Sequence, residues 1–205
     1  ECSDFSLENL GYRFPSYRNP DTGELFTDRE QCEYLRLIVK KGLSNKLLKL
    51  SEKHIQQIDK ELLTIFNLGF SGYFLIVWDL VRFARSQGIL CQGRGSAANS
   101  LVCYAIGVTS VDPVESGLLF ERFLSENRQS WPDIDIDFPS GDRRESVIQY
   151  VYQKYAPRGA AMTANVITYK PRSAFREMSK ILGFPESIAN RFTDLCASPK
   201  VHDAS

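Results

Sequence analysis

Three aspartates alternate with apolar residues at positions 132–138, where the sequence is Pro-Asp-Ile-Asp-Ile-Asp-Phe. In an extended strand the side chains alternate between two faces, so Asp133, Asp135 and Asp137 share one face and the apolar side chains share the other. Like charges this close repel one another unless a cation or several hydrogen-bond donors stabilise them. Proteins bind Mg²⁺ through carboxylates together with phosphate oxygens and water. The motif therefore predicts a metal platform for phosphate chemistry.

A second motif occupies positions 93–100, where the sequence is Gly-Arg-Gly-Ser-Ala-Ala-Asn-Ser. Glycines between a strand and a helix let the backbone approach an anion, and the free N–H groups of the helix N-terminus favour phosphate. Arg94 adds a fork of donors matched to phosphate oxygens. Ser96 caps the helix or offers its hydroxyl to the ligand. The segment therefore predicts a phosphate-binding loop that contains Arg94, Gly95 and Ser96.

Each motif also has a simpler interpretation. Acidic residues on one strand face can be solvated, and charge on an edge strand discourages aggregation. The glycines can form a tight turn followed by a helix cap. A calcium-binding EF-hand loop is excluded, because Phe138 stands where that loop requires glycine and Arg144 where it requires glutamate.

A dinucleotide-binding domain is a further alternative. Gly93-x-Gly95-x-x-Ala98 matches the relaxed fingerprint of such domains, with Asp112 and Glu115 near the distance expected of a ribose-binding acid. Against it, Asp112 precedes a proline in a turn-like stretch, and this reading leaves the three aspartates unexplained.

Composition narrows the class of protein. The 205 residues are 43% hydrophobic with zero net charge, which is ordinary for a globular protein. No run of 18 apolar residues and no secretory signal is visible, and the odd, scattered cysteines indicate a reducing cytoplasm. His54 and His202 are each distant in sequence from other candidate ligands, so a Ser-His-Asp mechanism is not expected.

The elements that must position these motifs alternate between helix and strand, which predicts an α/β or α+β fold. An irregular leader is expected at 1–26, and Pro171 and Pro185 suit the first turns of two last helices. Periodicity and capping signals predict helices at 27–41 (ending at Gly42), 51–67, 73–86, about 96–106, 114–124 and 142–155. Strands are predicted at 89–92, 133–138 and 161–168, and a domain boundary at 166–171.

Several segments, in order and with matching spacing, resemble the C family of DNA polymerases, the catalytic alpha subunits of bacterial DNA polymerase III. The segments that carry the resemblance are 72–77, 93–96, 112–113, 118–124 and 132–138. Residues 85–100 and 166–173 resemble the error-prone, damage-associated branch more than the main replicase. The resemblance runs from about residue 5 to residue 195.

The resemblance implies a polymerase-beta-like nucleotidyltransferase palm, a mixed sheet flanked by helices, followed by the start of a helical thumb. On this basis we expect the leader at 1–26, an incomplete palm at 27–168 and the beginning of the thumb at 169–205. Asp135 and Asp137 match the catalytic, metal-binding aspartates, and Asp133 is a supporting acid. The residues that match nucleotide-binding positions are Arg94, Gly95, Ser96 and Arg122.

The activity implied is template-directed DNA synthesis, in which two Mg²⁺ ions about 3.5–4 Å apart assist attack of the primer 3′-hydroxyl on a dNTP. From Arg158 to Lys180 there are five basic residues and one acidic residue. A solvated helix face explains such a cluster, but Lys170, Arg172 and Arg176 are also placed to follow the backbone of primer–template DNA.

The expected partners are DNA and dNTP, together with a sliding clamp and accessory damage-tolerance proteins that bind outside this segment, in the bacterial cytoplasm and without a membrane. The family's third palm aspartate and its N-terminal PHP domain have no counterpart here. We therefore expect a piece of a longer enzyme with little or no activity by itself. A non-catalytic, palm-like module is the remaining alternative.

Overall fold

The structure is a computed structural model that describes residues 17–20, 22–47, 50–125, 131–156, 159–163 and 165–195. The chain divides into two compact units, Glu1–Ala161 and Met162–Ser205, and each is described by itself. Most of the predicted leader, together with Arg158 and His202, lies outside the described residues.

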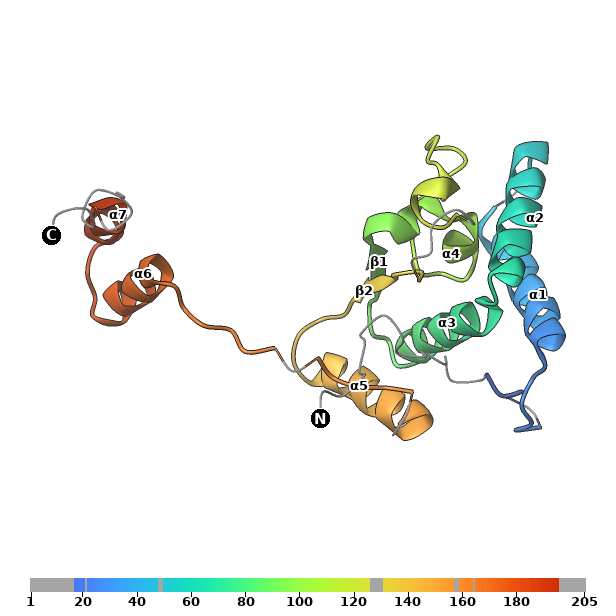
Figure 1. The fold of residues 1–205 in the computed structure, drawn as a ribbon, viewed down its shortest axis with the longest axis horizontal. Helices are drawn as coiled ribbons and strands as arrows, with labels where there is room; N and C mark the ends of the chain where they lie inside the picture. Colours follow the sequence, from blue (N-terminus) through green and yellow to red (C-terminus); the bar gives the residue numbers. More distant parts are fainter. Residues whose placement is uncertain are drawn as a thin grey trace, which may run out of the picture. The chain divides into compact units, whose positions relative to one another are not determined.

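The first unit is mostly helical (Figure 1). Its α-helices are α1 (Asp28–Lys46), α2 (Glu52–Asn67), α3 (Ser71–Ser86), α4 (Leu101–Ala105) and α5 (Asp142–Tyr155). In the described residues its remaining elements are the strands β1 (Gln92–Arg94) and β2 (Asp135–Asp137) and the 3₁₀ helices η2 (Gly95–Asn99) and η3 (Phe120–Arg122).

Local sequence explains where the first two long helices begin. The Thr27 hydroxyl accepts from the Glu30 N–H at 3.3 Å, and the Glu30 carboxylate accepts from the Thr27 N–H at 2.8 Å. Ser51 and His54 form the same reciprocal capping box at the start of α2. Each box satisfies N–H groups that a helix start leaves without an intrahelical partner. The predicted starts of both helices are confirmed.

The core of the first unit surrounds the short helix α4. All five residues of α4 are buried. Helices α1 and α2 both pack against α4, and α1 also packs against α3. Leu35, Leu62 and Phe74, from the three long helices, belong to the same hydrophobic cluster as α4. Because α4 is enclosed along its length, protein groups must satisfy the backbone at both of its ends.

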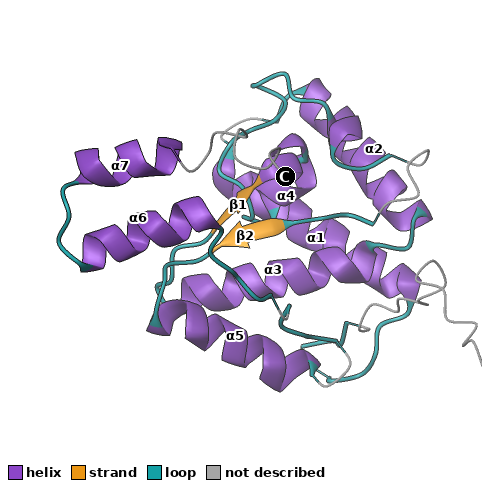
Figure 2. Ribbon diagram, turned by 60° about the vertical axis from the view of Figure 1, so that its left-hand side comes forward, coloured by secondary structure: helices purple, strands orange, loops and turns teal. Residues whose placement is uncertain are grey.

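The sheet is smaller than predicted. In the described residues it has two strands, and β1 pairs antiparallel with β2 (Figure 2). The mixed α/β class is retained, but no larger mixed sheet is seen in this part of the chain. The predicted strand at 161–168 is wrong, because its described residues have no regular structure and are mostly exposed. The predicted strand at 89–92 lies instead at Gln92–Arg94.

Two helix predictions also need correction. Helix α1 continues past Gly42 to Lys46, because Gly42 is a close contact between helices, where a Cβ would lie 2.1 Å from the Ala105 carbonyl oxygen. The predicted helix at 114–124 is replaced by a turn, in which the Leu118 N–H donates to the Pro113 carbonyl at 2.8 Å, and by the single 3₁₀ turn of η3. The helices predicted at 51–67, 73–86 and 142–155 are present within two residues of their expected bounds.

The second unit contains α6 (Pro171–Ile181) and α7 (Glu186–Leu195), which pack against each other. Pro171 occupies the first turn of α6, as predicted. Phe175 of α6 contacts Phe192 of α7 with ring centroids 5.6 Å apart. In neither unit does a single described helix combine the length and apolar composition needed to cross a membrane; α2 and α3 meet those criteria only as a pair, bent by 114° at the break between them.

Candidate functional site

Pairing of β1 with β2 brings the glycine segment and the aspartate strand side by side. The register places Gln92 opposite Asp137 and Arg94 opposite Asp135. Figure 1 shows the two strands next to η2 and α4. Residues about forty positions apart in the sequence thus form one edge, as the phosphate-chemistry hypothesis requires.

The two faces of β2 differ as the alternation predicts. Ile134 and Ile136 pack against the main hydrophobic cluster. Asp133, Asp135 and Asp137 are exposed. The strand therefore presents its acids on one open face and anchors itself through the apolar side chains on the other.

Among the described residues, Arg94 is the cation nearest to Asp135 and Asp137. Its Nε atom lies 3.8 Å from Asp135 Oδ2 and 3.6 Å from Asp137 Oδ1. The carboxylate side chains are 53% and 59% exposed, so they keep contact with solvent. Contacts of this length between exposed groups contribute little to stability. The Asp135 and Asp137 carboxylates can therefore exchange Arg94 for a cation of higher charge.

Two glycines shape the neighbouring loop. A Cβ on Gly93 would lie 2.5 Å from Val108 Cγ1, and the Gly93 N–H donates to the Val108 carbonyl at 2.6 Å. Gly95 has φ +67°, a backbone conformation that favours glycine. It stands beside the acids, because a Cβ there would lie 3.9 Å from Asp135 Oδ2. Both positions need glycine for geometric reasons.

Ser96 does not cap the helix that follows. A 3₁₀ helix, η2, comes first, and Ser100 is the N-cap of α4, with its hydroxyl accepting from the Cys103 N–H at 3.1 Å. Ser96 Oγ instead donates to the Asp133 carbonyl at 3.5 Å, a long contact that links the loop to the chain entering β2. The predicted helix at 96–106 therefore starts later, and Ser96 lies within the loop itself.

The N-terminus of α4 is not open to a phosphate, which corrects the expectation for this loop. Glu61 of α2 accepts from the N–H groups of Leu101 and Val102, both at 3.0 Å. A carboxylate of the protein itself therefore occupies the position expected for the ligand. Of the groups predicted to bind phosphate, the Arg94 and Ser96 side chains remain candidates.

Arg122 lies on η3, which packs against η2. Its side chain is exposed. The preceding residue, Glu121, forms an ion pair with Lys60 and so attaches η3 to α2. The structure thus places Arg122 on an element adjacent to the loop.

The predicted DNA-binding residues belong to the second unit. Lys170, Arg172 and Arg176 are exposed on or just before α6. Arg172 also joins α6 to α7, because its guanidinium donates to the Thr193 carbonyl and to the Asp194 carboxylate, both at 3.3 Å. Arg172 therefore has a structural contact that its sequence did not indicate.

Two buried acids were missed by sequence reasoning. Glu61 and Asp79 are both 0% exposed. Glu61 lies among the apolar positions of α2, and Asp79 is the acid within the strongly apolar α3. A charged residue inside an apolar stripe was the available signal, because burial of a charge requires partners.

Asp79 fastens α5 to α3. Its Oδ2 accepts from Tyr150 Oη at 2.7 Å, Lys154 Nζ at 2.6 Å and Tyr155 Oη at 3.1 Å, and its Oδ1 from Arg82 at 3.1 Å. Figure 2 shows the two helices running alongside each other. Burial raises the pKa of the Asp79 carboxyl, but these donors outweigh burial, so the pKa lies below its ordinary value.

Tyr73 of α3 lies close to the acidic strand. Burial, with the nearby Asp133 and Asp135 carboxylates, raises the pKa of its hydroxyl to about 12. The hydroxyl therefore stays protonated at neutral pH.

His54 is less isolated than its sequence position indicated. Its Nε2 lies 3.0 Å from Asp112 Oδ2, and its Nδ1 lies 2.6 Å from Ser51 Oγ. Ser51 and His54 are the capping box of α2, and Asp112 also accepts from the Val114 N–H at 2.9 Å. The three residues tie a helix start to a turn. Asp112 is thereby engaged in the fold, which gives the ribose-binding alternative no support.

The donor set at β2 fits a hard divalent cation. Asp135 and Asp137 offer oxygen ligands on an exposed face, and the Arg94 guanidinium shows that positive charge is accepted there. Among the described residues, no group of three or more His, Cys, Asp or Glu side chains is arranged to hold a metal ion. The structure therefore supplies two adjacent carboxylates, and Asp133 does not complete a three-carboxylate group with them.

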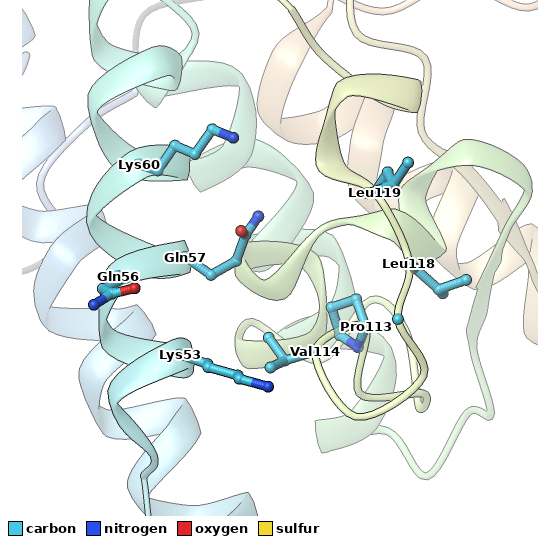
Figure 3. A pocket seen from close by; sticks show the side chains of 9 residues that line it. Lys53, Gln56, Gln57, Lys60, Pro113, Val114, Leu118 and Leu119 are labelled. Atoms are coloured by element: carbon cyan, nitrogen blue, oxygen red, sulfur yellow. The ribbon is translucent and has the colours of Figure 1, made fainter.

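A separate groove of about 400 Å³ lies between α2 and the turn at 113–119. Figure 3 shows Lys53, Gln57 and Lys60 on one wall, with the apolar residues of the turn opposite. None of the predicted site residues lines it. The groove is therefore separate from the edge formed by β1 and β2.

Comparison with known proteins agrees with the resemblance. The family described as the bacterial DNA polymerase III alpha NTPase domain matches residues 33–204. An error-prone DNA polymerase of Pseudomonas fluorescens is 46% identical over 193 residues, 94% of this chain and 18% of its own length. One of Mycobacterium bovis is 51% identical over 182 residues, 88% of this chain and 16% of its own.

A third, from Anaeromyxobacter dehalogenans, is 55% identical over 143 residues, which cover 70% of this chain and 12% of that protein. The chain thus spans less than a fifth of the length of these relatives. With the family match covering most of its residues, the chain belongs to the bacterial DNA polymerase III alpha family.

Proposed function

We propose that this chain is part of a template-directed DNA polymerase that carries out error-prone repair synthesis. The observation that carries the proposal is the β1–β2 register, which sets the Arg94 loop beside Asp135 and Asp137. The names of its relatives, error-prone DNA polymerases, agree with it. Residues 27–168 would be most of a polymerase-beta-like palm and residues 169–205 the beginning of a thumb.

In this reaction Asp135 and Asp137 hold Mg²⁺, with Asp133 as a supporting acid. A Mg²⁺ ion held there would supply the positive charge that favours deprotonation of the primer 3′-hydroxyl and offsets charge on the departing pyrophosphate. Arg94 turns from the carboxylates toward the triphosphate, where its planar fork matches phosphate oxygens. The backbone at Gly95 and Ser96 and the Arg122 guanidinium orient the same nucleotide, so the protein contributes positioning and charge.

Primer–template DNA would lie along the basic residues of α6. Lys170, Arg172 and Arg176 contribute contacts to the phosphate backbone, which give salt-dependent affinity without base specificity. A sliding clamp and damage-tolerance proteins would bind elsewhere in the polymerase, and the setting would be the bacterial cytoplasm.

The test is calorimetric titration of the protein with a dNTP plus Mg²⁺ and, separately, with NAD⁺, followed by primer extension by the full-length polymerase that carries this chain. Metal-dependent dNTP binding and template-directed extension are expected. Binding of NAD⁺ without metal, with no extension, would favour the dinucleotide alternative. Absence of both activities in the full-length protein would indicate a non-catalytic module.

A further inference from the structure

The buried carboxylate of Glu61 receives four hydrogen bonds. Oε1 accepts from Gln57 Nε2 at 2.8 Å and from the Leu101 N–H at 3.0 Å. Oε2 accepts from Ser100 Oγ at 2.7 Å and from the Val102 N–H at 3.0 Å. Three of the four donors belong to the N-terminus of α4, about forty positions away in the sequence.

Every partner of Glu61 is a donor. The Ser100 hydroxyl already accepts from the Cys103 N–H, so its own hydrogen points to Glu61. Burial keeps the pKa of the Glu61 carboxyl above its ordinary value, although the four donors favour its ionised form. The isosteric glutamine would place an amide NH₂ where an acceptor is required, leaving a buried donor facing another donor.

The far end of α4 is held by charges of the opposite sign. Lys46 of α1 donates to the Tyr104 carbonyl and, at 3.3 Å, to the Thr109 carbonyl. Arg85 of α3 donates to the Gly107 carbonyl at 2.6 Å. An acid at the N-terminus and cations at the C-terminus both match the helix dipole. Three surrounding helices therefore hold α4 in place.

The loop between Gly93 and Ser100 is consequently anchored on both sides. Ser100, where the loop ends, is held by Glu61. Gly93, where it begins, is bonded to Val108 just beyond α4. With both ends tied to the α4 segment, the position of α4 sets where Arg94 and Gly95 stand relative to Asp135.

We propose that Glu61 is a positioning residue for the incoming nucleotide: from within the core it fixes the α4 N-terminus and hence the loop that carries Arg94, Gly95 and Ser96. The proposal rests on the proposed function, because it names what the loop is positioned to bind. Glu61 itself does not reach the exposed edge where phosphate would lie.

The experiment introduces Glu61→Gln into the full-length polymerase and measures kcat, the KM for dNTP and the Kd for primer–template DNA at saturating Mg²⁺. We expect the KM to rise about ten- to a hundredfold, the range for loss of a residue that orients a binding group, while the DNA Kd changes less than about twofold. Ser100→Ala removes one of the four donors and the cap of α4. Ser100→Ala should also raise the KM for dNTP, by a smaller factor than Glu61→Gln.

Asp79→Asn is the matched control, because Asp79 is equally buried and also has four donors but joins α3 to α5. It should lower the melting temperature and leave the KM for dNTP within about twofold. If Glu61→Gln and Ser100→Ala also lower only the melting temperature, with an unchanged KM, the positioning role is refuted. Should Glu61→Gln not fold, the Ser100→Ala result decides.

Amide hydrogen exchange separates this inference from the proposed function. Exchange across residues 93–103 should become faster in Glu61→Gln and in Ser100→Ala but not in Asp79→Asn. A wild-type polymerase that neither binds dNTP with Mg²⁺ nor extends a primer refutes the proposed function. Faster exchange would then still show that Glu61 holds the loop, and unchanged exchange would refute that as well.

Discussion

Four acids among the described residues occupy two contrasting environments. Glu61 and Asp79 are fully buried, and each receives four hydrogen bonds from the protein. Asp135 and Asp137 are more than half exposed and lie 3.6–3.8 Å from Arg94. The buried pair has its lone pairs occupied by the fold, whereas the exposed pair keeps oxygen atoms facing solvent.

The difference shows how the surroundings of a carboxylate decide whether it stabilises the fold or stays free to bind a ligand. Removing a charge from water is costly, so a buried carboxylate persists only with several donors around it. A metal site needs the opposite, namely carboxylate oxygen atoms that no protein donor has taken. Substituting Asp79 and substituting one of the exposed strand aspartates should therefore have opposite consequences for activity and stability.

The largest effect is expected for the exposed pair. In the full-length polymerase, Asp135→Asn or Asp137→Asn should reduce incorporation by about 10³-fold or more, because a metal ligand that stabilises transition-state charge is lost. DNA affinity and melting temperature should stay close to wild type. Steady-state incorporation and thermal denaturation measure the two quantities. Turnover near the wild-type rate would end the metal assignment.

For the buried Asp79, stability should change instead. Asp79→Asn should lower the free energy of unfolding by about 3 kcal/mol, because Lys154 and Arg82 lose their buried counter-charge. Urea denaturation measures this. The exposed control Asp59→Asn, whose carboxylate lies 3.5 Å from Arg36, should cost less than about 1 kcal/mol. Equal losses of unfolding free energy in Asp79→Asn and Asp59→Asn would contradict the difference proposed between buried and exposed carboxylates.

The same residue predicts a pH dependence. Because the pKa of Asp79 is lowered in the folded protein, its contribution to stability is present above the ordinary aspartate pKa of about 4 and is lost as pH falls through the lowered value. The loss of stability on acidification should therefore be shallower in Asp79→Asn than in wild type. Urea denaturation at several pH values between neutral and strongly acidic conditions tests this.

A smaller effect is expected at Arg94. Arg94→Ala should raise the KM for dNTP about tenfold with a lesser change in kcat, because one charged contact to the triphosphate is lost. The KM of Arg94→Lys should lie between those of the wild type and Arg94→Ala, since lysine keeps the charge but not the planar fork. Arg29→Ala is the control, an exposed arginine paired with Glu33. An unchanged KM and kcat in Arg94→Ala would make the loop purely structural.

The smallest effect concerns Lys46. Burial, with the nearby Arg85 charge, lowers the pKa of Lys46 to about 8. The unfolded chain then binds more protons above that pH, so the free energy of unfolding should rise by about 1 kcal/mol between pH 8 and 10, a modest gain because the group is partly solvated. Lys46→Met should abolish the rise, whereas Lys41→Met, at an exposed position of α1, should retain it.

Local signals predicted much of the fold. Thr27 and Ser51 start their helices because the capping partner lies three residues away, within the same segment. Pro171 begins α6 for an equally local reason. The predicted helix end at Gly42 was wrong, because this glycine allows close contact with Ala105, sixty-three positions later, and does not end the helix. The end of this helix was thus misplaced at a residue that contacts a segment far away in the sequence.

The sequence alone determined the two candidate motifs, because the alternating acids of residues 133–137 and the glycine loop at 93–96 are each complete within a few positions. Only the tertiary structure decided which acids were available to bind a ligand. Glu61 looked like any charged residue on α2 until α4 was found to place three donors around it, and β1–β2 pairing brought Arg94 to Asp135 and Asp137. The physical reason is that a carboxylate can bind a ligand only if solvent, and not protein donors, surrounds its oxygen atoms within a few ångströms. Those surroundings are set by packing between segments far apart in the sequence.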